Sequence, residues 1–231
     1  MRGRLRISFL LWACASTLPA AEIEGTVVIQ RKLTRRRVTA PLSAYQRGVA
    51  VELKEDAPSN DLAFERQRVV IYLEGRRPPE PVTFTMDQKN RRFVPDTLVV
   101  PAGSTVSFPN LDPIFHNVFS LSKPKSFDLG NYPRNQTRTV QFPKPGIVFV
   151  NCHLHPNMGA VIVVTPNQWS TKAAADGAFR LTGVPPGNYT VVAWHKAAGF
   201  FRKQLQVTGQ HAATIQFQIP LAGDGSVLAQ R

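Results

Sequence analysis

The sequence contains very little cysteine and no long apolar run. Among its 231 residues there are 2 cysteines, Cys14 and Cys152. The most apolar stretch, residues 7–15, is too short to cross a bilayer as a helix, which needs about 20 residues. The sequence therefore predicts no transmembrane segment.

That apolar stretch lies in an N-terminal segment, residues 1–21, which has the pattern of a secretory signal peptide. Arginines precede it, and small residues follow it up to Ala20 and Ala21, after one of which we expect cleavage. A lipoprotein signal ending at Cys14 fits less well because of Trp12. We therefore expect a protein that is periplasmic or otherwise exported, with Cys152 as its sole cysteine.

A single remaining cysteine excludes an intramolecular disulfide and a binuclear copper centre built on two thiolates. An unpaired thiol in an oxidising compartment is a liability unless the protein uses it. A bound metal ion would use it.

Acidic residues are also few, 15 against 28 lysines and arginines, and the formal net charge is +13. Such a balance inside a cell would suggest nucleic acid, but export argues against that partner. An acidic partner protein and peripheral association with an anionic membrane surface both stay open. The charge could also serve solubility alone.

The sequence has no long stretch with helical periodicity, and its apolar residues mostly alternate in short runs bounded by Pro, Gly, Asn and Asp. Many short strands at regular spacing predict an all-β fold of β-sandwiches. The expected strands are 24–30, 49–53, 69–73, 82–86, 97–100, 105–109, 117–120, 137–142, 146–151, 159–164, 178–182, 187–195, 202–207 and 213–219.

Three potential metal ligands of different chemistry lie in one loop. Residues 151–159 read Asn-Cys-His-Leu-His-Pro-Asn-Met-Gly, between an expected strand that ends at 151 and another that begins at 159. The loop contains Cys152, His155 and Met158. Upstream, His116 follows a turn at 110–113 and opens another expected strand.

This set of side chains suits copper better than other metals. A site with one cysteine, two histidines and a weak axial methionine accepts both Cu(I) and Cu(II). Structural zinc sites use four Cys or His ligands. A cysteine nucleophile activated by a histidine would leave Met158 and His116 without a role. A buried cysteine with scattered histidines is the remaining alternative.

Three segments of the sequence resemble the cupredoxins. They are Phe-His-Asn-Val-Phe-Ser at 115–120, Phe-Asp-Leu-Gly at 127–130 and Cys-x-x-His-Pro-x-Met at 152–158. The spacing of the last is similar to amicyanin and to plastocyanin-like proteins linked to methylamine utilisation. The resemblance covers residues 82–165. It implies a cupredoxin Greek-key β-sandwich with one copper ion, held by His116, Cys152 and His155 in the equatorial plane and by axial Met158.

The resemblance also implies roles for residues around the copper. The backbone amide of Asn117 would bond the Cys152 sulfur, and its side chain would brace the ligand loop. Pro156 has no N–H and would leave that sulfur without a second bond. His155 would lie nearest the surface and pass the electron, inside an apolar docking patch made, besides Pro156, of Pro113, Ile114, Phe115 and Asn157.

Two further histidines need a separate interpretation. His153 alternates with Cys152 at a strand end, so we expect it to point away from the metal and to be structural or exposed. His195 is interpreted as an ordinary strand-end histidine.

The C-terminal block resembles the carboxypeptidase regulatory-like domain, a small transthyretin-like β-sandwich. The resemblance rests on Asp-Gly-Ala-Phe at 176–179 and on Val-Pro-Pro-Gly-Asn-Tyr at 184–189. Only about ten polar residues precede the first motif, so two opening strands are missing there. Gly-Thr-Val at 25–27 and Val-Ile-Tyr-Leu at 70–73 resemble those strands.

The expected organisation has four parts. Residues 1–21 are the signal peptide, 22–81 provide N-terminal strands, 82–165 form the cupredoxin domain and 166–231 form the regulatory-like domain. We favour insertion of the cupredoxin into a loop of the second sandwich, because insertions at exposed loops are tolerated. An N-terminal extension followed by two tandem domains is the alternative.

These observations favour an exported, non-enzymatic type 1 (blue) copper protein that carries single electrons between redox partners, which the basic charge predicts to be acidic. A non-redox copper storage or delivery protein is the alternative from a different class. A cell-envelope scaffold with a degenerate site is a third, which the complete ligand set disfavours.

Overall fold

The computed structural model describes residues 21–33, 61–75, 80–209 and 211–219. The regular elements of this part are strands, apart from one short helix, α1 (Asp61–Arg66), so the expected all-β class is confirmed. No helix in these ranges is long and apolar enough to cross a membrane. Most of the expected signal peptide and the strand expected at 49–53 lie outside the described residues.

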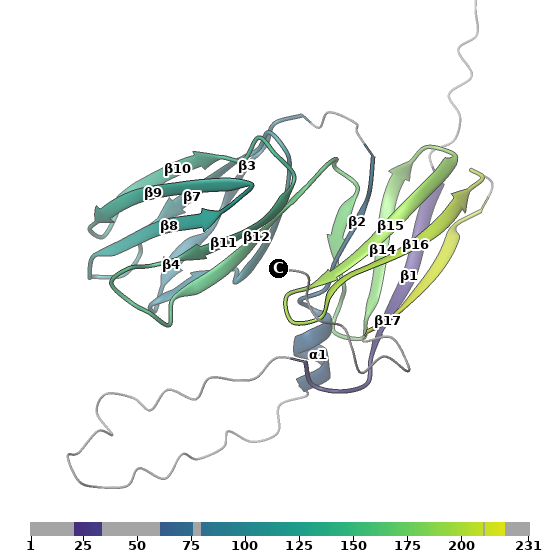
Figure 1. The fold of residues 1–231 in the computed structure, drawn as a ribbon, viewed down its shortest axis with the longest axis horizontal. Coiled ribbons are helices and arrows are strands. Elements are labelled where there is room, and N and C mark those ends of the chain that lie inside the picture. Colours follow the sequence, from purple (N-terminus) through teal and green to yellow (C-terminus); the bar gives the residue numbers. More distant parts are fainter. Residues whose placement is uncertain (1–20, 34–60, 76–79, 210, 220–231) are drawn as a thin grey trace, which may run out of the picture.

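The middle of the chain forms the first of two β bodies that lie side by side in Figure 1. One sheet has the order β10-β7-β3, the other the order β6-β12-β11-β8-β9, and β4 and β5 form a separate hairpin. The strands are β3 (Thr83–Thr85), β4 (Asp87–Lys89), β5 (Arg92–Val94), β6 (Thr97–Pro101), β7 (Thr105–Pro109), β8 (His116–Ser122), β9 (Lys125–Tyr132), β10 (Thr137–Gln141), β11 (Gly146–Asn151) and β12 (Gly159–Thr165).

Side-chain alternation builds the core of this first sandwich. In β11, Val148 and Val150 are buried while Phe149 between them is 43% exposed, as the two-residue period of a strand requires. Cys152 follows two positions after Val150 and is also buried, so it continues the inward-facing row. Buried side chains from both large sheets form one core that includes Cys152 and Met158.

The second β body combines strands from both ends of the described chain. Figure 1 shows purple β1 beside yellow β17. The sheets have the orders β14-β1-β17 and β13-β2-β15-β16. The strands are β1 (Ala21–Ile29), β2 (Val70–Leu73), β13 (Ser170–Lys172), β14 (Ala178–Val184), β15 (Gly187–His195), β16 (Gly199–Val207) and β17 (Ala213–Ile219).

The partners of β1 and β2 define how the two bodies are connected. β1 is antiparallel to β14 and parallel to β17, and β2 pairs with β13 and β15. No register pair of β1 lies in residues 82–165. The first sandwich is thus placed between β2 and β13 of the second one. The likeness of the second sandwich to a regulatory-like domain stays a prediction.

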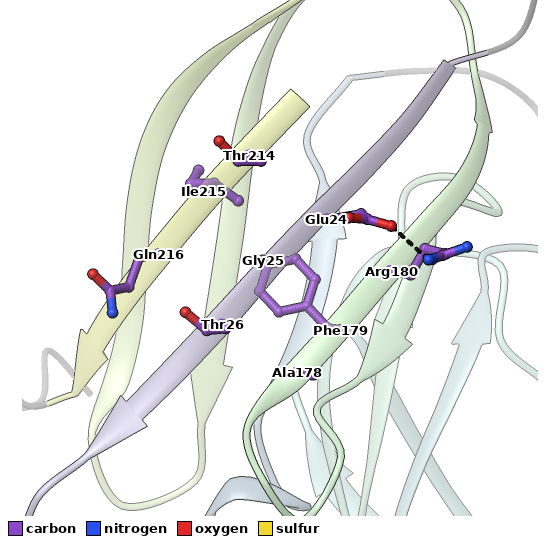
Figure 2. Close-up of a pocket in the computed structure, with 9 residues that line it drawn as sticks. All are labelled: Glu24, Gly25, Thr26, Ala178, Phe179, Arg180, Thr214, Ile215 and Gln216. Carbon is purple, nitrogen blue, oxygen red and sulfur yellow. Dashed lines mark ion pairs between the residues drawn. The ribbon is translucent and has the colours of Figure 1, made fainter. Parts of the chain in front are cut away.

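A glycine at the centre of β1 permits close packing of this second sandwich. A Cβ at Gly25 would lie 2.3 Å from the ring of Phe179 and 2.3 Å from the carbonyl oxygen of Ile215. Figure 2 shows the Phe179 ring next to β1 at Gly25. Neighbouring β14 can therefore place an aromatic ring against the central strand only because this position has no side chain.

A buried side-chain amide links the two segments that connect the sandwiches. The chain leaves the second sandwich after β2 and returns near Asn167, which is 1% exposed. The Asn167 side-chain amide donates hydrogen bonds of 3.0 Å to the carbonyl oxygens of Leu73 and Gly75. The outgoing and incoming segments are thereby held at one place.

The two sandwiches also share an apolar contact. In β12, Val161 and Val163 are buried although they point away from their own core, and they pack with Val70 and Trp194 of the second sandwich. Burial on both faces explains why nearly all of β12 is apolar. An ion pair between Arg68 and Asp96 crosses the same boundary.

A buried histidine–carboxylate pair joins α1 to β15. His195 and Glu65 are both 0% exposed, with His195 Nε2 3.0 Å from Glu65 Oε2. His195 Nδ1 accepts a hydrogen bond of 3.2 Å from the Ala197 N–H, so the neutral ring carries its proton on Nε2. Burial lowers the pKa of His195 and outweighs the opposing effect of the Glu65 charge.

This pair predicts a pH-dependent stability. A folded-state pKa below the ordinary value near 6.5 means that the unfolded chain binds the proton first, so stability is complete above that value and is lost as the pH falls below it. We expect the free energy of unfolding to decrease as the pH falls from 7.5 to 5.5. Protonation of His195 contributes up to about 1.4 kcal/mol per pH unit to this decrease. Urea titrations of wild type and His195→Gln measure it.

The matched control is His211→Gln, at an exposed position of the same sandwich. We expect His195→Gln to flatten the pH dependence and His211→Gln to leave it unchanged. Equal slopes for the wild type and His195→Gln would contradict the assignment.

Candidate metal centre

The loop between β11 and β12 is closed by its own backbone. The Cys152 N–H donates to the Met158 carbonyl oxygen at 3.2 Å, and the Met158 N–H donates to the His155 carbonyl oxygen at 2.9 Å. The first bond extends the β11–β12 ladder beyond Asn151 and Gly159. The second forms a tight turn, so His155 lies at the tip while Cys152 and Met158 stay near the core.

Three donor side chains converge at this end of the first sandwich. One ligand atom each from His116, Cys152 and His155 lies within 4.8 Å of the others. The Nδ1 atoms of the two histidines are 3.1 Å apart, and Cys152 Sγ lies 3.7 Å from His155 Nδ1. His116 comes from the start of β8, so the structure brings together side chains that are far apart in the sequence.

These separations fit ligands of a single metal ion. Metal bonds of about 2.0 Å to nitrogen and about 2.3 Å to sulfur place neighbouring donor atoms about 3 to 4 Å apart. The separations of 3.1 and 3.7 Å from His155 Nδ1 lie in this range, and the whole cluster lies within 4.8 Å. Without a metal, a contact of 3.1 Å between two Nδ1 atoms requires that one of them carries a hydrogen and donates it to the other. The donor set of two nitrogens and one sulfur is soft enough for copper and is able to hold zinc.

Asp112 orients the buried histidine. His116 is 0% exposed, and its Nε2 lies 2.8 Å from Asp112 Oδ2. An ionised carboxylate only accepts hydrogen bonds, so Nε2 carries the proton and the Nδ1 lone pair faces His155 and Cys152. This carboxylate–histidine arrangement is the one that fixes ring orientation at many metal sites.

The carboxylate of Asp112 also accepts two backbone hydrogen bonds. The donors are the N–H groups of Asn90, at 2.7 Å, and Arg91, at 2.8 Å. Burial by itself would raise the pKa of Asp112, but hydrogen bonds from Arg91, His116 and Asn90 outweigh it and hold the pKa below its ordinary value. Asp112 is therefore ionised and can serve as the proton acceptor that His116 requires.

His155 is the donor residue nearest the solvent. It is half-buried, whereas Cys152 is 4% exposed. Burial, followed by the charges of His116 and Arg91, lowers the pKa of His155. Its ring is therefore neutral at pH 7 and offers a lone pair.

Asn117 braces the thiol from the next strand. Its N–H points to Cys152 Sγ at 3.4 Å, and its Oδ1 accepts a bond of 3.4 Å from the His153 N–H. Its Nδ2 donates to Asp128 Oδ1 at 2.7 Å. The Gly130 N–H and this Asn117 amide lower the pKa of Asp128, which stays ionised. The brace thus extends from the ligand loop to β9.

The remaining predicted site residues lie as follows. Met158 is 1% exposed and belongs to the core of the first sandwich. The expected second-shell Pro156 is exposed. The docking-patch residues are all exposed and lie on the His116 loop or the ligand loop: Pro113, Ile114, Phe115 and Asn157.

His153 points away from the donor cluster. Its ring stacks on Phe119, with centroids 3.6 Å apart and planes 3° from parallel. Its Nε2 lies 3.7 Å from Asp128 Oδ2, and both side chains are more than half exposed. His153 is a surface group beside the site.

Sequence reasoning missed Asp112 and the β4–β5 hairpin that it holds. Asp112 was interpreted only as part of a turn, and its role depends on its spacing of four residues from His116. That spacing was a usable signal. The contact with Asn90 and Arg91 was not foreseeable, because it depends on how a hairpin that was not predicted folds against the loop.

Comparison with known proteins gives a partial likeness to cupredoxins. Solved structures similar to this chain include a Cu-containing nitrite reductase from Thermus scotoductus SA-01, 26% identical over 39% of this chain and 24% of that one, TM-score 0.35. A novel purple cupredoxin from Nitrosopumilus maritimus is 21% identical over 36% of this chain and 99% of that one, with a TM-score of 0.32. A reduced amicyanin variant is 20% identical over 41% of this chain and 97% of that one, with a TM-score of 0.34. Neither a protein-family model nor a curated protein matches.

Removing the charge of Asp112 should weaken metal binding. In Asp112→Asn the side-chain amide accepts the His116 proton less strongly and can instead donate, which favours the wrong tautomer. We expect the affinity for Cu(I), measured by competition with a chromogenic chelator, to fall about 10- to 100-fold. Asp87→Asn, which removes the same charge from the far end of the β4–β5 hairpin, should bind as the wild type does. Unchanged affinity in Asp112→Asn would refute the positioning role.

Proposed function

We propose that this chain is an exported type 1 copper protein that carries single electrons between redox partners and is not an enzyme. The observation that carries the proposal is the convergence of the Cys152 sulfur with the Nδ1 atoms of His116 and His155. Met158 is proposed as the axial ligand, from its place at the end of the same loop. Copper in such a site changes between Cu(I) and Cu(II) and so supplies a one-electron couple.

The supports around the donors favour electron transfer over storage. His116 is fixed by Asp112, Cys152 by the Asn117 N–H, and His155 by the backbone turn to Met158. Donor atoms held this firmly move little when the charge of the ion changes. A storage or delivery site has the opposite requirement, since its ligands must rearrange to release the metal.

The burial of the donors favours a carrier over a catalyst. His116, Cys152 and Met158 are at most 4% exposed, so a substrate has no direct path to them. The half-buried His155 is then the side chain through which an electron enters or leaves. The exposed apolar surface around it includes Ile114, 40% exposed, and Phe115, 56% exposed, and is suited to contact with a partner protein.

The N-terminal sequence supports export to an oxidising compartment. The arginines and apolar run before Ala20 are typical of a signal peptide. In the folded chain Ala21 is 6% exposed and pairs with Val184 at the start of β1. Cleavage after Ala20 would keep this residue in the sheet, and we therefore propose that position over the next one.

The test is the visible spectrum of the mature protein after addition of Cu(II). We expect intense thiolate-to-copper absorption that disappears on reduction, returns on reoxidation and is abolished by Cys152→Ser. The matched control is His153→Gln, which changes the adjacent residue but leaves the three donors in place, and it should keep the absorption. A colourless complex would overturn the copper site. A coloured complex that loses its metal on reduction would favour storage instead.

A further inference from the structure

A basic hairpin tip borders the surface at which His155 is reached. Residues 89–92, Lys-Asn-Arg-Arg, join β4 to β5, and all four are exposed. Asn90 and Arg91 line the same hollow as His155, a depression of about 440 Å³ that Pro113 and Ile114 also border. Three cations therefore lie on this turn, and one of them, Arg91, lines the hollow beside His155.

The backbone of this turn is held in an unfavourable conformation. Asn90 and Arg91 have φ angles of 55° and 54°, as a two-residue hairpin turn of this hand requires. Glycine is favoured at the second position, and an arginine there costs on the order of 1 kcal/mol. The two hydrogen bonds to Asp112 offset that cost. An arginine at a position suited to glycine indicates that its side chain has a use.

The base of the hairpin is also fixed to the site. Gln88 is 0% exposed, and its Nε2 donates to Tyr132 Oη at 2.5 Å. The Leu111 N–H donates to the Gln88 carbonyl oxygen at 2.9 Å. The hairpin is therefore attached to the His116 loop through both Gln88 and Asp112, and its cations keep a constant position relative to the donors.

The charges of this turn have no ion-pair partner among the residues that the structure describes. Three arginines elsewhere in the described chain pair with acids: Arg68 with Asp96, Arg180 with Glu22 and Glu24, and Arg202 with Glu74. In the part of the chain that the structure describes, no carboxylate side chain forms an ion pair with Lys89, Arg91 or Arg92. The nearest acid of the site, Asp112, is buried and already bonded to two N–H groups and to His116.

We infer that the 89–92 turn is the element that recognises an acidic redox partner and guides it onto the His155 surface. This inference rests on the proposed electron-carrier function and adds the chemistry of the partner, a protein with carboxylates around its own electron-transfer site. Cations at the rim of an apolar contact mainly raise the rate of association, because they steer the encounter. A rigid turn adds orientation, since the cations define one side of the patch.

The experiment uses the copper-loaded mature protein and an acidic c-type cytochrome as the probe, with electron transfer followed by stopped flow. The variant is R91E/R92E. The matched control is K123E/K144E, which makes the same change in net charge on exposed turns at the other end of β8 and β11, roughly 20 Å away along the strands. Both variants must keep the wild-type visible spectrum.

We expect the second-order rate constant at low ionic strength to fall about tenfold in R91E/R92E and less than twofold in the control. The difference should disappear at high salt, where exposed charges are screened. Equal slowing of both variants, or of neither, would overturn the inference. So would loss of binding to anionic lipid vesicles in R91E/R92E with an unchanged cytochrome rate, because the turn would then recognise a membrane.

Failure of the underlying function gives a different result. Reduced wild-type protein is also mixed with hexacyanoferrate(III), a small oxidant that needs no protein docking surface. If that reaction does not occur, the carrier function is wrong and the docking inference falls with it. The hexacyanoferrate(III) reaction can instead occur, at the same rate in the wild type and in the control. If R91E/R92E then reduces the cytochrome at the same rate as the control does, only the docking inference is wrong.

Discussion

The backbone pairing of Cys152 with Met158 is the constraint on which the rest of the site depends. It continues the β11–β12 ladder by one step, so the side chain of Cys152 keeps the inward direction of Val148 and Val150. The thiol therefore reaches the donor cluster by ordinary strand alternation. The turn that follows leaves His155 as the member of the loop closest to solvent.

Asp112 gives the other half of the site an equivalent support. One buried carboxylate holds the ring of His116 and both N–H groups of the Asn90–Arg91 turn. The geometry of the donor cluster and the charge at the surface are therefore fixed by the same group. A change in one is transmitted to the other through hydrogen bonds shorter than 3 Å, each charge-assisted and worth about 1.5–3 kcal/mol.

The parts of the fold set by local alternation were predictable from the sequence. The strands 105–109, 146–151, 187–195 and 213–219 have the expected bounds. The first and the last alternate apolar and polar residues, and the middle two contain apolar runs that lie between turn signals. The helix α1 and the strands β4, β5, β9 and β13 were not predicted. α1 is a single short helix, and the four strands are short or half-exposed, so their formation depends on tertiary partners.

The same distinction applies to the site. Cys152, His155 and Met158 share one loop, so their spacing alone indicates a metal. His116 was a candidate from its place after a turn at the start of a strand, and the resemblance of the segment around it implied its role as an equatorial ligand. The spacing of four residues between Asp112 and His116 was a signal that was not used, whereas the contact of Asp112 with the hairpin could not be recognised without the fold. The expectation of a plain strand-end histidine at His195 also missed its buried contact with Glu65, because α1 was not foreseen.

The interrupted second sandwich sets the order in which this chain can fold as it is made. β1 and β2 leave the ribosome or the export channel long before β14, β15 and β17 exist, yet Ala21 needs Val184 and Ile23 needs Ala213. The first sandwich, whose strand partners all lie within residues 83–165, can close while those two strands wait with unpaired edges. Biogenesis of this protein therefore includes a period in which β1 and β2 are unpaired, and a chaperone or a rapid rate of synthesis would protect these strands from aggregation.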